Sequence, residues 1–307
     1  MNVKSYERQI LTPSGIIRIL KEQKLTLKKR YGQNFLINPD IAAAVVDSAG
    51  LRRSDTVIEI GPGLGALTFP AARRVKSLVA CEVDRGFARL LERKAGLLGH
   101  SNVRVVTADF LKADLEELAG FSPPAKVISN FPYNIGIRAI IRIVENLASV
   151  ETITGTVQEE LAQRLLARPG TKNYAAVSVY IQYMADIKTL RSRISPSNFF
   201  PVPDVTSSVI QVSPIRARHP IPPGLFRRVV KASFASRRKS LLNNLYHLAG
   251  TEARETIAGT VLSTFGNERV RAEALTVDDF IALCRGLSGT GILSAGLDAS
   301  HQGGMGE

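Results

Sequence analysis

A short apolar run that ends in a cluster of glycines constrains the fold of this chain more than any other feature. Residues 55–60 (Asp-Thr-Val-Ile-Glu-Ile) are typical of a buried β-strand, and Gly61, Gly63 and Gly65 follow directly. Glycines at this place allow a tight turn and let a ligand approach the backbone, near the N-terminus of a helix expected from about residue 66. The same spacing also fits a dinucleotide-binding fingerprint, and a tight turn without any ligand is a further alternative.

Strand-like and helix-like segments alternate on both sides of these glycines. Apolar runs predict further strands at 78–83, 103–107, 126–129, 152–157, 186–194 and 206–212, and helices are predicted at 12–21, 40–49, 85–94, 159–167 and 174–184. This alternation indicates an α/β fold with a mostly parallel sheet covered by helices on both faces.

Breaks in the pattern predict four parts of the chain. Ser213-Pro214 ends the strand-rich region, and the prolines and glycine at 220–224 mark a linker. The predicted parts are an N-terminal extension (1–30), an α/β domain (31–214), a small helical domain (215–285) and a glycine- and serine-rich tail without fixed structure (286–307).

Charge and composition limit the classes of partner. The 307 residues include 40 Lys and Arg against 27 Asp and Glu, a formal charge of +13, which favours nucleic acid but would also suit an acidic protein or a membrane surface.

The two cysteines and four histidines have no metal-ligand spacing, so we expect no metal and a reducing, cytoplasmic location. No apolar stretch approaches the ~20 residues of a membrane span, so no membrane association is expected.

Carboxylates follow two of the predicted strands. Glu82 ends the second strand, about 20 residues after the glycines, where a carboxylate can accept both hydroxyls of a ribose. Asp109 follows the third strand and could accept from an adenine amine, although an aspartate there is often only a helix cap. These two residues do not separate a nicotinamide cofactor from S-adenosylmethionine.

The segment Asn130-Phe131-Pro132-Tyr133 follows the fourth strand and indicates a specific chemistry. Ligands of open α/β sheets bind beyond such strand ends. The lone pair of adenine N6 is delocalised into the ring, so two acceptors that hold its hydrogens favour a pyramidal, nucleophilic nitrogen. The Asn130 side-chain oxygen and the Phe131 carbonyl suit this task, while Pro132 rigidifies the loop and Tyr133 offers a ring on which a base can stack. We therefore expect catalysis by positioning rather than by a general base.

Six segments in this order carry a resemblance to a known family. They are residues 31–36 (Tyr-Gly-Gln-Asn-Phe-Leu), 59–65, 82–84, 108–109, 130–135 and 199–203 (Phe-Phe-Pro-Val-Pro). With them the chain resembles, over roughly residues 25–285, the ribosomal RNA adenine N6,N6-dimethyltransferases, closest to the KsgA-type branch that acts on small-subunit (16S) RNA. The resemblance implies a class I S-adenosylmethionine-dependent methyltransferase fold, a Rossmann-like seven-stranded sheet with a small C-terminal helical domain.

The resemblance also implies roles for single residues. Cofactor contacts are implied for Asn34, Leu36, Gly61, Gly63, Glu82, Asp109 and Asn130. Asn130 and Phe131 would hold the target amine, and Tyr133 and Phe199 would sandwich the flipped adenine. Three positions depart from the usual pattern: Phe131 replaces Leu or Ile, Asp204 replaces Lys, and Thr206 replaces Asp.

A basic segment in the helical domain resembles the family's RNA-binding helix. Its candidate phosphate contacts are Arg227, Arg228, Lys231, Arg237, Arg238 and Lys239. A solvated amphipathic face is the alternative interpretation.

The sequence thus predicts an enzyme that dimethylates two adjacent adenosines near the 3′ end of 16S ribosomal RNA, as a monomer acting on an assembling small subunit. Three alternatives stay open. They are a large-subunit (23S) RNA methyltransferase of the macrolide-resistance type, a non-catalytic RNA-binding assembly or transcription factor on the same fold, and a nicotinamide oxidoreductase.

Overall fold

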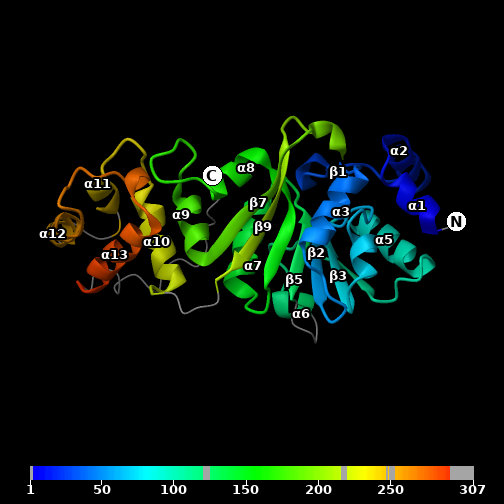
Figure 1. Cartoon of the computed structure of the whole chain (residues 1–307), viewed down its shortest axis with the longest axis horizontal. Helices are drawn as coiled ribbons and strands as arrows, with labels where there is room; N and C mark the ends of the chain where they lie inside the picture. Colours follow the sequence, from blue (N-terminus) through cyan, green and yellow to red (C-terminus); the bar gives the residue numbers. More distant parts are fainter. Residues whose placement is uncertain (1–2, 120–124, 216–219, 247, 249–252, 291–307) are drawn as a thin grey trace. The chain divides into compact units, whose positions relative to one another are not determined.

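Seven strands form the main sheet of the computed structural model, which describes residues 3–119, 125–215, 220–246, 248 and 253–290 (Figure 1). The spatial order is β4-β3-β2-β5-β6-β9-β7. The strands are β2 (Thr56–Ile60), β3 (Ser77–Glu82), β4 (Val103–Thr107), β5 (Lys126–Asn130), β6 (Thr152–Gln158), β7 (Ala185–Ile194) and β9 (Ser207–Pro214). The pairs from β4 to β6 are parallel, and β9 runs antiparallel to β6. The predicted seven-stranded α/β sheet is confirmed.

The parallel register places the ends of four strands at one edge. In β2 all five residues are buried, which explains why its sequence is mainly apolar and lacks a polar alternation. Ile60 at the end of β2 pairs with Cys81 of β3 and with Ser129 of β5. Glu82 pairs in turn with Thr107 of β4. The residues that follow these strands therefore share the carboxyl edge of the sheet.

Helices connect the strands of this sheet. They are α3 (Pro39–Ser48), α4 (Thr68–Ala72), α5 (Arg85–Leu97), α6 (Leu115–Ala119), α7 (Gly136–Asn146) and α8 (Glu159–Leu165). Side-chain caps fix two of the starts, because Asn38 accepts from the first turn of α3 and Asp84 from the Gly86 N–H of α5. The helices α6 and α7 were not among the predicted elements, and α7 begins without a side-chain cap.

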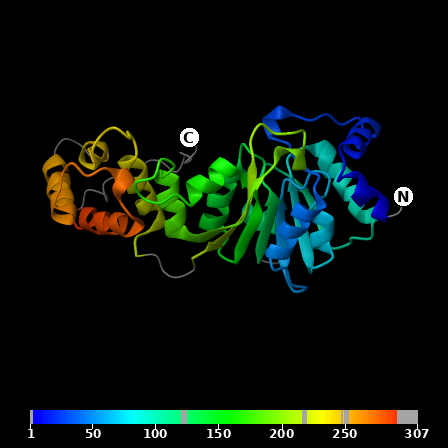
Figure 2. The same ribbon diagram turned by 45° about the horizontal axis from the view of Figure 1, so that its top comes forward.

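The N-terminal segment differs from the predicted extension. The predicted helix at 12–21 is confirmed as α2 (Pro13–Glu22), but a further helix, α1 (Val3–Gln9), precedes it, and both lie beside α5 (Figures 1 and 2). Tyr6, Ile10, Ile16 and Ile19 are buried in the same hydrophobic core as the sheet. This α1–α2 hairpin is therefore part of the α/β unit, because its apolar face has a partner there.

A second, two-stranded sheet joins segments far apart in the chain. Strand β1 (Phe35–Leu36) pairs antiparallel with β8 (Phe199–Phe200), with Phe35 opposite Phe200 and Leu36 opposite Phe199. No prediction covered these short strands. Their pairing brings together the first and last of the six sequence segments that carry the family resemblance.

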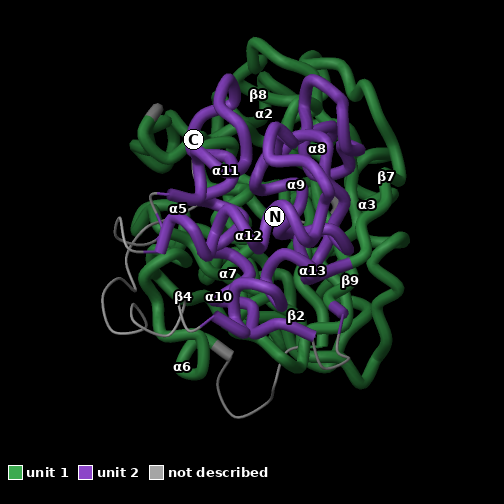
Figure 3. The backbone as a smooth tube through the Cα atoms, turned by 90° about the vertical axis from the view of Figure 1, so that its left-hand side faces the viewer, with its two compact units in different colours: residues 1–162, 186–214 green, residues 163–185, 215–307 purple. Residues whose placement is uncertain are grey.

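The structure divides into two compact units whose boundary differs from the predicted one (Figure 3). The first contains residues 1–162 and 186–214, and the second contains residues 163–185 and 215–307. Residues 163–185 were predicted to belong to the α/β domain. They join the helical unit because α9 (Ala176–Met184) packs on α10 (Pro223–Ser233) and α13 (Val277–Ser288).

Aromatic side chains fill the interior of the second unit. Tyr183 of α9 stacks on Phe226 of α10 with ring centroids 3.8 Å apart, and Phe226 meets Phe280 of α13 edge to face. Helices α11 (Leu241–Leu245) and α12 (Arg254–Phe265) complete the described part of the unit. The last helix, α13, ends at Ser288, three residues past the predicted domain boundary at 285. The tail was predicted for 286–307, and its residues 291–307 lie outside the described residues. Among the described residues, no helix is long and apolar enough to cross a membrane.

Candidate active site

The loop after β2 has a backbone that only glycine adopts readily. Gly61, Gly63 and Gly65 have φ values of 64°, 55° and 95°. The loop is also closely surrounded. A Cβ at Gly61 would lie 3.1 Å from Pro132, one at Gly63 would lie 2.8 Å from Phe35, and one at Gly65 would lie 2.3 Å from Phe69. Larger residues would thus both strain the turn and displace its neighbours.

Glu82, the last residue of β3, forms a hydrogen bond with this loop. Its carboxylate is 4% exposed, and its two oxygens accept hydrogen bonds from the backbone N–H groups of Gly63 (3.1 Å) and Asp84 (2.9 Å). Burial raises the pKa of Glu82, while these two N–H groups act in the opposite direction. Each carboxylate oxygen has a second lone pair, so the predicted contact with ribose hydroxyls is chemically possible. That contact stays a prediction.

Asp109 lies at the same edge, after β4. It is half-buried, and its Oδ1 accepts from the backbone N–H of Leu111 at 3.0 Å. The local role is therefore that of a turn cap, which the sequence had left as an alternative. Its predicted contact with an adenine amine stays a prediction.

Asn130 is fixed by two hydrogen bonds in an orientation that suits its predicted role. Its Nδ2 donates to the backbone carbonyl of Asn34 at 2.6 Å, and its Oδ1 accepts from the Thr156 hydroxyl. The backbone N–H of Phe131 also donates to Thr156, at its carbonyl (3.1 Å). The amide oxygen of Asn130 keeps one lone pair for a further donor. Sequence reasoning missed Thr156, which belongs to a neighbouring strand and is adjacent only through the β5–β6 register.

Tyr133 is half-buried and anchored at its hydroxyl. The hydroxyl lies 2.7 Å from Oγ of Ser207 at the start of β9, and burial raises the pKa of Tyr133. Next to it, the Asn134 side chain donates to the Arg30 carbonyl at 2.8 Å. A Cβ on Gly32 would lie only 2.9 Å from Asn134. The predicted segments 31–36, 59–65 and 130–135 therefore meet at one place.

Phe199 was expected to expose its ring to the adenine, but its side chain is buried. Its side chain is 0% exposed and belongs to the hydrophobic core, and Leu36 opposite it is 1% exposed. Consecutive residues of a strand point to opposite faces, so Phe200 is the more exposed of the pair. A ring without exposed surface offers no face to a base in this conformation. Stacking by Phe199 stays a prediction and would require movement of this sheet. Cofactor contact by Leu36 also stays a prediction, and with its side chain buried the contact would go through its backbone.

Glu59 is a candidate site residue that sequence reasoning did not single out. It is 1% exposed in β2, two residues before Gly61, and its Oε2 has no hydrogen-bond partner among the described residues. Burial raises its pKa to about 8, and the negative charge of Glu82 acts in the same direction. The only sequence signal was a carboxylate inside an otherwise apolar strand.

The wild-type protein is expected to lose stability as the pH rises, and Glu59→Gln is expected to abolish this loss. The pKa of Glu59 is about 8 in the folded chain against an ordinary 4.5, so the folded state binds this proton more tightly. The wild-type free energy of unfolding should then fall as the pH rises through this interval, by a few kcal/mol at most. Urea unfolding at pH 5, 7 and 9 measures the effect. A difference between variant and wild type that is the same at all three pH values would contradict it.

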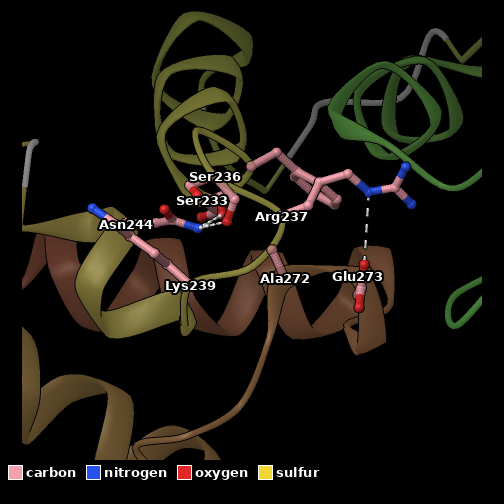
Figure 4. Close-up of a pocket in the computed structure, with 8 residues that line it drawn as sticks. Ser233, Ser236, Arg237, Lys239, Asn244, Ala272 and Glu273 are labelled. Carbon is pink, nitrogen blue, oxygen red and sulfur yellow. Dashed lines mark hydrogen bonds and ion pairs between the residues drawn. The ribbon is translucent and has the colours of Figure 1, made fainter.

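The candidate RNA contacts lie in and after α10. Lys231, Arg238 and Lys239 are exposed, whereas Arg227 and Arg228 are half-buried. Arg237 is exposed but engaged, since its guanidinium lies 3.8 Å from the Glu273 carboxylate and donates to the Lys172 carbonyl at 2.9 Å (Figure 4). The phosphate contacts stay a prediction, and Arg237 already has protein partners in Glu273 and Lys172.

The loop that carries Arg237, Arg238 and Lys239 is itself well held. The buried Asn244 donates through Nδ2 to the carbonyls of Ser233 (2.7 Å) and Ser236 (3.0 Å), as Figure 4 shows. These residues line a small pocket together with Phe234, Arg237, Lys239, Ala272 and Glu273. Asn244 therefore fixes the turn between α10 and α11 and presents the basic side chains from a defined backbone.

The seven-stranded sheet and the loop at its carboxyl edge define a class I S-adenosylmethionine-dependent methyltransferase fold. A dimethyladenosine transferase from Plasmodium falciparum has a similar structure, with a TM-score of 0.71 and 21% identity over 83% of this chain and 97% of the other. The 23S rRNA methyltransferase ErmE matches with a TM-score of 0.60 and 24% identity over 82% of this chain and 99% of the other. At these identities the likeness concerns the fold alone.

Sequence comparison identifies the family. The model of the family described as ribosomal RNA adenine dimethylase matches residues 24–285. The chain is 37% identical to ribosomal RNA small subunit methyltransferase A of Shouchella clausii over 92% of this chain and 97% of the relative. It is 38% identical to the protein of the same name from Ligilactobacillus salivarius, over 92% of this chain and 98% of that relative. The chain belongs to the ribosomal RNA adenine dimethylase family.

Proposed function

We propose that this protein dimethylates N6 of two adjacent adenosines near the 3′ end of 16S ribosomal RNA, with S-adenosylmethionine as the methyl donor. Family membership and the two small-subunit methyltransferases that match along nearly their whole length support the proposal. The observation that carries it is the meeting of the Asn130–Tyr133 segment with the glycine loop through Pro132 and Gly61. Amine positioning and cofactor binding can then occur side by side.

The residues of the site fit the cofactor. The glycine loop has positive φ values at the carboxyl edge of the sheet, which let a ligand approach its backbone, and the buried Glu59 carboxyl has an oxygen without a partner among the described residues. The residues that would hold the cofactor are Asn34, Leu36, Gly61, Gly63, Glu82, Asp109 and Asn130. When bound, S-adenosylmethionine supplies an electrophilic methyl group on a sulfonium centre.

The chain's own residues position the nucleophile. The Asn130 Oδ1 and the Phe131 carbonyl accept the two amine hydrogens of the adenine, which directs the nitrogen lone pair toward the methyl group. The Thr156 hydroxyl and the Asn34 carbonyl hold the Asn130 amide in this orientation. An amide is not a base, so the proton leaves the nitrogen after transfer. Tyr133, anchored on Ser207, would stack on the base.

The second unit would bind the RNA by charge. Lys231, Arg238 and Lys239 offer exposed cations, which can contact phosphates and orient the substrate without reading its sequence. An assembling small subunit in the cytoplasm is the proposed substrate, and the protein would act on it as a monomer.

Methyl transfer to purified ribosomal subunits tests the proposal. We expect label from S-adenosylmethionine to enter 30S subunits from a strain that lacks this modification, and to be recovered as dimethyladenosine after digestion. Fully modified 30S subunits serve as the control and should accept none. Label in 50S subunits only would favour the large-subunit alternative. Cofactor binding without any transfer would instead favour a non-catalytic RNA-binding factor.

A further inference from the structure

We propose that the α1–α2 hairpin is part of the cofactor site, with Tyr6 as a positioning residue for the glycine loop. The inference rests on the proposed use of S-adenosylmethionine. The Tyr6 hydroxyl donates to the backbone carbonyl of Leu64 at 3.3 Å, across 58 residues of sequence. Leu64 lies between Gly63 and Gly65, so this bond reaches the centre of the loop. The family model begins at residue 24 and does not cover the hairpin.

The ring of Tyr6 supports the loop in a second way. It packs edge to face on Phe69, with centroids 5.9 Å apart and an interplanar angle of 77°. Phe69 is the same ring that a Cβ on Gly65 would meet at 2.3 Å. Tyr6 is 1% exposed, and burial raises its pKa, so the hydroxyl stays protonated as a donor. One side chain thus braces both Leu64 and, through Phe69, Gly65.

The hairpin is anchored independently of the loop. Glu7 forms an ion pair with Arg73 at the end of α4 (2.6 Å), and the Lys94 ammonium of α5 lies 4.5 Å from the centre of the Tyr6 ring. Within the hairpin, a Cβ on Gly15 would lie 2.2 Å from the Gln9 carbonyl, so α1 and α2 are in close contact. Tyr6 therefore comes to the loop from a fixed support.

Support of this kind should affect cofactor affinity more than the chemical step. A loop with three glycines at positive φ has many other backbone conformations, and ordering it on binding costs conformational entropy. A contact that orders the loop beforehand reduces this cost. The hydrogen bond and the ring contact of Tyr6 go to Leu64 and Phe69 rather than to the Asn130–Tyr133 segment, so the handling of RNA should not change.

The test is Tyr6→Phe in the full-length protein, which keeps the ring and removes the hydroxyl. We expect the Kd for S-adenosylhomocysteine, measured by calorimetry, to rise about 3–10-fold, as for the loss of one hydrogen bond. The KM for S-adenosylmethionine should rise by a similar factor, with kcat unchanged on 30S subunits.

Tyr174→Phe is the matched control. Its hydroxyl also donates to a buried backbone carbonyl, that of Leu275 at 2.7 Å, but within the second unit. It should cost similar stability and leave the Kd unchanged. Wild-type affinity in Tyr6→Phe, or equal weakening in both variants, would overturn the inference while wild-type methyl transfer stands. A wild-type protein that binds cofactor but methylates neither subunit would overturn the proposed function alone, and one that does not bind cofactor would overturn both.

Discussion

Replacing Asn130 by alanine is expected to lower the rate of methyl transfer about 10²–10³-fold, the effect typical of losing one preorganised hydrogen-bonding group at a reacting centre. The variant lacks the amide oxygen that accepts an amine hydrogen, and the Asn34 carbonyl and Thr156 hydroxyl lose their partner. Because Asn130 is also a predicted cofactor contact, the rate is best measured in single turnovers on 30S subunits at saturating S-adenosylmethionine.

Two further variants make this result specific. Asn146→Ala removes an asparagine that also donates to a backbone carbonyl, that of Arg142 at 2.9 Å, on the exposed end of α7. It should retain the wild-type rate. Thr156→Val keeps Asn130 but removes the donor that orients its Oδ1, so an intermediate loss of about 10-fold is expected. A single-turnover rate within about threefold of wild type in Asn130→Ala would show that the amide does not position the amine.

Lys126→Met is expected to lower the free energy of unfolding by about 3–5 kcal/mol, because it leaves one member of a buried ion pair alone. The ammonium of Lys126, at the start of β5, lies 2.7 Å from the Asp55 carboxylate and 2.6 Å from the Gly50 carbonyl. Both side chains are buried, and without Lys126 the Asp55 carboxylate keeps the backbone N–H of Arg52 as a donor but loses its countercharge. Urea unfolding followed by circular dichroism measures the change.

A surface ion pair provides the comparison. Arg74 pairs with Asp47, and both side chains are largely exposed, so Arg74→Met should cost less than about 1 kcal/mol. The double variant Lys126→Met with Asp55→Leu should recover part of the lost stability, since no buried charge is left without its partner. If Lys126→Met lowered the free energy of unfolding no more than Arg74→Met does, the buried pair would contribute no more to stability than the exposed pair.

The sequence predicted the sheet because each strand carried its own signal. Residues 56–60 and 126–129 are buried and contain the apolar pairs Val57-Ile58 and Val127-Ile128 without a regular polar alternation, and parallel strands end at one edge. Glu82 and Asn130 could therefore be placed at the same edge from the order of the strands alone. The glycine loop could be predicted as well, because a positive φ limits the choice of residue at three positions.

Other parts of the site could not be predicted in this way. Thr156 is an ordinary strand residue, and only the β5–β6 register places its hydroxyl on Asn130. The burial of Phe199 follows from the pairing of β8 with β1, two residues long on each side. A strand so short shows no periodicity, so the sequence could not show whether Phe199 is buried or is a ring exposed to the substrate.

What the sequence by itself determined is the α/β class, the strand order along the chain, and the strand ends that carry Gly61, Glu82 and Asn130. Local patterns decide these features, since side-chain period and glycine conformation act within a few residues. Only the tertiary structure decided that residues 163–185 join the helical unit and that Tyr6 reaches Leu64. Both depend on which distant surface buries an apolar face, and hydrophobic burial is non-directional, so a local pattern shows that a face needs a partner but not which partner it finds.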